Sequence, residues 1–206
     1  MADDFGTRLA ERVRACRAPV VVGLDPRREQ LPAGLGRKSE DPADVADAYR
    51  EFCDGVVDAV AALVPAVKPQ AAFFEQLGPA GVTALAGVIR YAREAGLLVI
   101  LDAKRNDIGS TAAAYADGLL GAESAFGADA LTVSPYLGRD SLTPFVDMAT
   151  ERGAGVFVLV KTSNPSGGQF QDLNAQGKRL YQHVAEEVNA LNEPTIGAAG
   201  YGAVGA

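Results

Sequence analysis

Hydrophobic positions along the chain fall into short, nearly continuous apolar runs, separated by longer stretches with helical spacing. The apolar runs cover residues 19–25, 62–68, 97–102, 128–134, 155–161 and 202–206. Such runs are typical of strands that are covered on both faces in a parallel sheet. We therefore expect five parallel strands and the beginning of a sixth.

The stretches between these runs carry signals for helix ends. Asp41 before Pro42 predicts a helix that runs to about Leu63, since Asp is a favourable N-cap and Pro fits the first turn. Gly96 predicts the end of a helix over 79–94. Further helices are expected over 110–126, 141–152 and 177–191. Strand and helix thus alternate, as in a doubly wound sheet or a barrel.

Polar residues at the ends of the apolar runs distinguish these two folds. Asp25, Lys68 and Asp102 close the first three runs, and barrels build their chemistry at the carboxyl ends of several strands. A doubly wound nucleotide-binding fold would place a glycine-rich loop after its first strand, and residues 23–26 form no such loop. The sequence therefore predicts an α/β fold, a (β/α)8 TIM-type barrel with about six βα units present.

Composition limits the function classes. With 206 residues and 48% hydrophobic content, the chain fits one domain over residues 1–206. A net charge of −7 disfavours nucleic acid and anionic membranes as partners. Cys16 and Cys53 show neither metal-ligand spacing nor a disulfide framework, and no signal peptide or membrane-spanning run is evident. We expect a cytoplasmic protein.

The strongest chemical signal is the charged segment that follows the third run. Asp102, Lys104 and Asp107 form a D-x-K-x-x-D pattern there, and buried charges are costly unless they are paired. A surface salt-bridge cluster would also explain the pattern. Lys68, at the end of the preceding run, favours a site with alternating Lys–Asp–Lys–Asp charges.

Such an array has a definite chemistry. A Lys104 ammonium flanked by carboxylates is a proton donor and stabilises a carbanion, but it is no amine nucleophile. Asp102 would repel an anionic substituent of a bound substrate, and that repulsion disappears when the substituent leaves as CO2; ground-state repulsion is a contested source of rate. We expect stabilisation of the carbanion by Lys104 to contribute more to the rate than repulsion by Asp102 does. The array therefore predicts cofactor-free decarboxylation followed by protonation.

These residues resemble the catalytic signature of the orotidine 5′-monophosphate decarboxylase family. The motifs are residues 66–69 and 102–108, supported by residues 23–26, 73–75, 132–136 and 161–165, which are similar to the longer bacterial subgroup. The resemblance implies conversion of orotidine 5′-monophosphate to uridine 5′-monophosphate (UMP), the last step of de novo pyrimidine synthesis, without cofactor or metal. It implies that Asp25 binds the ribose, Lys68 anchors the charge network and sugar hydroxyls, Asp102 faces the orotate carboxylate and Lys104 protonates C6.

The resemblance also implies a shared site. Asp107 and Thr111 correspond to family residues that reach into the neighbouring subunit's site, which implies a homodimer. Ser163, with Pro165 beside it, matches the position that hydrogen-bonds the pyrimidine after the fifth strand. Ile108, inside the catalytic motif, completes the expected substrate-binding set.

The chain departs from the pattern at its C-terminal end. A full barrel has eight strands and typically ~250 residues, and it holds phosphate in the loops after strands seven and eight. The family uses an arginine there, and no matching loop follows residue 201. We therefore expect a C-terminally incomplete barrel with poor turnover, because remote phosphate binding lowers the barrier at the reacting centre.

Three alternatives remain open at this point. A magnesium-dependent sugar-phosphate lyase or decarboxylase of the same barrel superfamily shares D-x-K-x-x-D, although Lys68 and Lys104 would crowd its metal. A Schiff-base aldolase would need a neutral lysine. A truncated, inactive nucleotide-binding fragment is the non-enzyme alternative.

Overall fold

The computed structural model describes residues 4–35 and 39–206. Its contacts divide the chain into two compact units. Unit A consists of Arg8–Ala103 and Glu123–Asp129, and unit B of Met1–Thr7, Lys104–Ala122 and Ala130–Ala206. Two elements belong to both: helix α1 (Phe5–Cys16) and strand β3 (Leu98–Arg105) each cross from one unit to the other.

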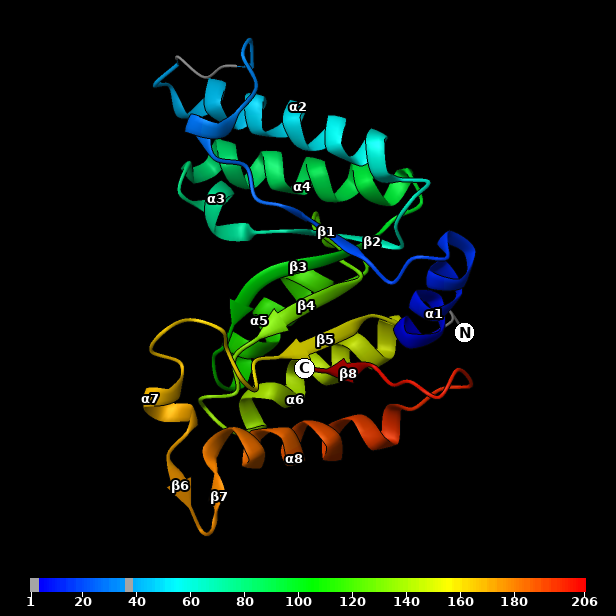
Figure 1. Cartoon of the computed structure of the whole chain (residues 1–206), viewed down its shortest axis with the longest axis vertical. Coiled ribbons are helices and arrows are strands. Elements are labelled where there is room, and N and C mark those ends of the chain that lie inside the picture. Colours follow the sequence, from blue (N-terminus) through cyan, green and yellow to red (C-terminus); the bar gives the residue numbers. More distant parts are fainter. Residues whose placement is uncertain (1–3, 36–38) are drawn as a thin grey trace. The chain divides into compact units, whose positions relative to one another are not determined.

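Unit A contains three parallel strands in the order β1-β2-β3. Strand β1 (Val21–Leu24) pairs with β2 (Ala66–Pro69), and β2 pairs with β3. Val67 lies opposite Val22 on one side and Val99 on the other. The remaining elements are η1 (Arg28–Gln30), α2 (Pro42–Val60), α3 (Ala71–Glu75) and α4 (Gly78–Glu94). Helices α2 and α4 lie side by side (Figure 1).

Local sequence signals explain the ends of the two long helices of unit A. The Asp41 side chain accepts a hydrogen bond from the Ala43 N–H at 2.9 Å, and Pro42 occupies the first turn of α2. Gly96 has φ = +82° directly after α4, a conformation that favours glycine. Both predicted helix ends are therefore confirmed.

A buried carboxylate, Asp129, holds several elements of unit A together. Asp129 is 4% exposed and accepts hydrogen bonds from the Val99 N–H at 3.0 Å and from Arg8 of α1 at 2.7 Å. Arg93 of α4 lies 3.6 Å from the same carboxylate. Asp129 therefore joins α1 and α4 to the amino-terminal half of β3, away from the strand end that carries Asp102.

Unit B contains the remaining parallel strands, β4 (Ala130–Val133), β5 (Gly155–Val158) and β8 (Val204–Gly205), in that order. The carboxyl end of β3 joins them, because the Ser134 N–H donates to the Arg105 carbonyl at 2.9 Å. The helices are α5 (Gly109–Leu120), α6 (Arg139–Arg152), α7 (Gly168–Gln171), α8 (Leu180–Asn192) and η2 (Glu193–Thr195). A short hairpin, β6 (Asn174–Ala175) with β7 (Lys178–Arg179), precedes α8.

The predicted alternation of parallel strands and helices is confirmed: all six apolar runs contain a strand, and helices separate them. Two helix predictions were wrong at one end. The helix expected over 110–126 ends at Leu120, because Gly121 leaves the helical region with ψ = 150°. The helix expected from residue 177 begins at Leu180, because β7 occupies Lys178–Arg179. The hydrophobic pattern predicts neither α3 and α7 nor the hairpin.

In the described part of the chain, no helix has the length and apolarity needed to cross a lipid bilayer.

Candidate active site

Asp102 is the centre of the charge cluster in unit A. Its side chain lies at the carboxyl end of β3, where the residue is 7% exposed. Lys68, on β2, places its Nζ 2.9 Å from Asp102 Oδ2. The Lys68 side chain remains 34% exposed, so the pair opens towards solvent on the lysine side. The predicted contact between the second and third strand ends is therefore present.

Gln70 is a second donor to the same carboxylate oxygen. Its Nε2 lies 3.1 Å from Asp102 Oδ2. Its backbone is fixed as well, since its N–H donates to the Leu24 carbonyl at 3.2 Å and the residue forms a parallel bridge with Asp102. Two donors on one oxygen fix the orientation of a largely buried carboxylate, which would be costly to leave unpaired.

Lys104 lies two residues further along β3, in unit B, and has an unusual backbone. Its φ is +49°, a left-handed conformation that costs roughly 1–2 kcal/mol in a residue other than glycine. Its N–H donates to Oγ1 of Thr132, a buried residue, at 2.9 Å, which holds this conformation in place. The Lys104 side chain is exposed. A strained backbone at a candidate proton donor is consistent with a functional constraint.

Asp107 and Thr111 lie at the amino-terminal end of α5. The Asp107 Oδ1 accepts from the Ile108 N–H at 2.8 Å, and Ile108 is the N-cap residue of the helix. A carboxylate is favoured at this end of a helix. Thr111 is exposed and Ile108 is 57% exposed, so this turn presents both polar and apolar groups at the surface of unit B.

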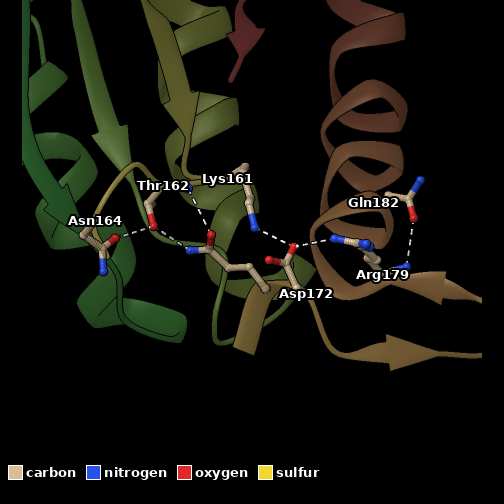
Figure 2. Close-up of polar contacts among 7 residues, drawn as sticks. Lys161, Thr162, Asn164, Asp172, Arg179 and Gln182 are labelled. Atoms are coloured by element: carbon tan, nitrogen blue, oxygen red, sulfur yellow. Dashed lines mark hydrogen bonds and ion pairs between the residues drawn. The ribbon is translucent and has the colours of Figure 1, made fainter. Parts of the chain in front are cut away.

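The other expected substrate-binding residues also follow strands. Asp25 comes directly after β1 and is exposed. Ser163 and Pro165 are exposed in the segment after β5. That segment is held by polar contacts around Lys161, Thr162 and Asp172 (Figure 2). The hydrogen bond from Lys161 is the main contact that holds the pKa of the Asp172 carboxyl below its ordinary value.

Sequence reasoning missed Gln70 and Thr132. The second strand was expected to end at Lys68, whereas β2 ends at Pro69. Gln70 is therefore the polar residue that directly follows the strand. Polar residues at strand ends were the criterion that identified Lys68, and they include Gln70. Thr132 belongs to the segment 132–136 that resembles the family, but it lies inside an apolar run and acts through the backbone of Lys104, so the hydrophobic pattern assigns it no role.

Among residues 4–35 and 39–206, no three His, Cys, Asp or Glu side chains are grouped so that they could hold a metal ion. At Asp102 the ammonium of Lys68 occupies the position that a cation would take.

Comparisons with known proteins agree with this geometry. The family model described as "Orotidine 5'-phosphate decarboxylase / HUMPS family" matches residues 18–204. The orotidine 5′-phosphate decarboxylase of Rhodopirellula baltica is 59% identical over 208 residues, which cover 98% of this chain and 69% of that protein. The enzyme of the same name from Salinispora arenicola is 47% identical, covering 98% of this chain and 70% of that one.

A solved structure is similar to this chain in both fold and sequence. A protein from Streptomyces avermitilis, assigned as an orotidine 5′-phosphate decarboxylase, superimposes with a TM-score of 0.84 at 41% identity. The match covers 98% of this chain and 68% of that chain. The (β/α) barrel fold class is thereby confirmed, and the chain belongs to the orotidine 5′-phosphate decarboxylase / HUMPS family.

Proposed function

We propose that this chain catalyses the decarboxylation of orotidine 5′-monophosphate to UMP. The observation that carries the proposal is the Lys68–Asp102 ion pair at adjacent strand ends, followed on the same strand by Lys104. The relatives at 47% and 59% identity are named orotidine 5′-phosphate decarboxylases, which supports the same reaction.

The proposed chemistry uses only side chains of the protein. Asp102, fixed by Lys68 and Gln70, faces the substrate carboxylate. The bond between C6 and the carboxylate breaks, CO2 leaves, and the electron pair remains on C6. The Lys104 ammonium stabilises this carbanion and transfers a proton to C6, which gives UMP.

The substrate-binding roles are part of the proposal. Asp25 binds the ribose, and Ser163 with Pro165 contacts the pyrimidine. Ile108 contributes an apolar contact; its 57% exposure supports this, since a large apolar side chain at a surface turn is available to a ligand.

We further propose a homodimer with shared sites, in which Asp107 and Thr111 reach the site of the second subunit. The exposure of the first turn of α5 supports this arrangement. The cytoplasm is the proposed compartment, and the two cysteines, Cys16 and Cys53, which form no disulfide, support a reducing environment.

The magnesium-dependent lyase is the second candidate, because D-x-K-x-x-D occurs in that class too. The contact of Lys68 with Asp102 disfavours it, since the lysine competes with a cation for the carboxylate. An imine mechanism is disfavoured for a related reason, because it needs a neutral Lys104.

Product analysis after EDTA treatment tests the proposal. The chain is incubated with orotidine 5′-monophosphate, and UMP and CO2 are quantified by chromatography and gas trapping. Equal amounts of both products, unchanged by EDTA, are expected. Activity that EDTA abolishes and Mg²⁺ restores would establish the lyase-type alternative, and a borohydride-trapped adduct at Lys104 would establish the imine mechanism.

A further inference from the structure

The segment between β5 and α8 is tied together by a charged cluster (Figure 2). Lys161, which follows β5, places its Nζ 2.5 Å from Asp172 Oδ1. Arg179 of the hairpin approaches the same oxygen from the other side, at 3.3 Å. The Lys161 ammonium also lies 5.2 Å from the ring centroid of Tyr181 on α8. The cluster therefore connects the end of β5 to the hairpin and to α8.

A second set of contacts holds Thr162, the next residue. The Gln171 side chain forms two hydrogen bonds with Thr162. Its Oε1 accepts from the Thr162 N–H at 3.0 Å, and its Nε2 donates to Thr162 Oγ1 at 2.7 Å. The Thr162 hydroxyl in turn donates to Asn164 Oδ1 at 2.7 Å (Figure 2). Both the amide and the hydroxyl of Thr162 are therefore engaged.

Gly167 shows that the loop closes tightly over Thr162. It is buried, and a Cβ at this position would lie 2.9 Å from the Thr162 carbonyl oxygen and 3.1 Å from its Oγ1. Only glycine allows the two parts of the chain to approach this closely without a shift. Residues 162–171 thus form a loop whose ends are joined by Gln171 and whose middle packs on Thr162.

The residues enclosed by these contacts are the ones expected to meet the base. Ser163 and Pro165 are exposed and alternate with Thr162 and Asn164, which carry the internal hydrogen bonds. We propose that Gln171 and Thr162 are positioning residues for base recognition, which hold Ser163 where it hydrogen-bonds the pyrimidine ring. The inference rests on the proposed function and extends it to how the uracil-type base is selected.

The physical reason is preorganisation. A loop that is already ordered loses less conformational freedom when its ligand binds, so contacts of Ser163 with the base contribute more of their energy to affinity. Without the Gln171 contacts, the backbone on either side of Ser163 would sample other conformations. Contacts with the base would weaken, whereas contacts with ribose and phosphate would not.

Titration calorimetry with two ligands tests this selectively. UMP and D-ribose 5-phosphate share the sugar and phosphate and differ by the base. In Gln171→Ala and Thr162→Val, we expect UMP to bind about tenfold more weakly, since each substitution removes two of these hydrogen bonds. Binding of ribose 5-phosphate should stay the same. Thr162→Ser retains the hydroxyl and should restore UMP affinity.

Gln169→Ala is the matched control, because Gln169 is an exposed glutamine on α7, in the same loop. It should leave the affinity for both ligands unchanged. The inference is overturned if Gln171→Ala and Thr162→Val weaken both ligands equally or neither, or if Thr162→Ser behaves like Thr162→Val. A parent protein that binds UMP no more tightly than ribose 5-phosphate would overturn the proposed function as well.

Discussion

At the scale of single residues, Asp102 Oδ2 accepts from a charged donor, Lys68, and from an uncharged donor, Gln70. Gln70→Ala removes the uncharged donor and leaves the Lys68 ion pair intact. A hydrogen bond to a charged group contributes about 1.5–3 kcal/mol, so kcat should fall roughly tenfold or more, with a smaller change in KM. Steady-state kinetics with orotidine 5′-monophosphate measures both.

Gln76→Ala is the control for this prediction, because the Gln76 amide donates within its own turn, to the Phe73 carbonyl at 3.0 Å. It should keep the parent kcat. If the two variants have the same kcat, Gln70 has no part in positioning Asp102.

Cys53 shows what burial does to a single thiol. The residue is fully buried in α2, and burial raises its pKa to about 12 from the ordinary value of 9.0. At pH 8 its thiolate fraction should therefore be about a thousandfold smaller than that of an ordinary thiol. We expect one rapidly reacting thiol, Cys16, in the native protein and two after unfolding in urea, measured with a disulfide reagent. Two thiols that react equally fast in the native protein would contradict this.

At the scale of elements, two helical glycines have opposite roles. Gly81 in α4 faces the end of α3, and a Cβ there would lie 1.9 Å from the Phe74 carbonyl oxygen. Gly55 in α2 has open space around it. Gly81→Ala should therefore lower the free energy of unfolding, whereas Gly55→Ala should raise it by up to about 1 kcal/mol through helix propensity. Urea unfolding of both variants measures the difference, and an equal gain in both would show that α4 and α3 are not in contact.

The elements also show why part of the site was predictable and part was not. Apolar runs that end abruptly in a charge placed Lys68 and Asp102 at neighbouring strand ends, because adjacent parallel strands bring their carboxyl ends together. The left-handed backbone of Lys104 has no counterpart in the hydrophobic pattern, since it depends on a hydroxyl of another strand. The hairpin at 174–179 has strands of two residues, too short for any periodicity.

At the scale of the whole molecule, a homodimer with shared sites predicts complementation between inactive variants. Lys104→Ala and Asp107→Ala should each be inactive alone. Mixed dimers would contain one site with both residues intact, so a 1:1 mixture after subunit exchange should recover about a quarter of the parent activity. The measurement is turnover of orotidine 5′-monophosphate before and after mixing.

Lys68→Ala mixed with Lys104→Ala provides the control, because both residues would belong to the same subunit's site and no intact site would form. Recovery in that control, or none with Asp107→Ala, would contradict the shared site. Light scattering of the unmixed proteins gives the oligomeric state independently.

The central claim is that Lys104 protonates the carbanion left by loss of CO2. The most direct measurement is the decrease in ultraviolet absorbance as orotidine 5′-monophosphate becomes UMP. The parent chain and Lys178→Ala, which changes an exposed hairpin lysine, should both show the decrease, and Lys104→Ala should show none. No decrease with the parent chain, or the same decrease with Lys104→Ala, would contradict the account.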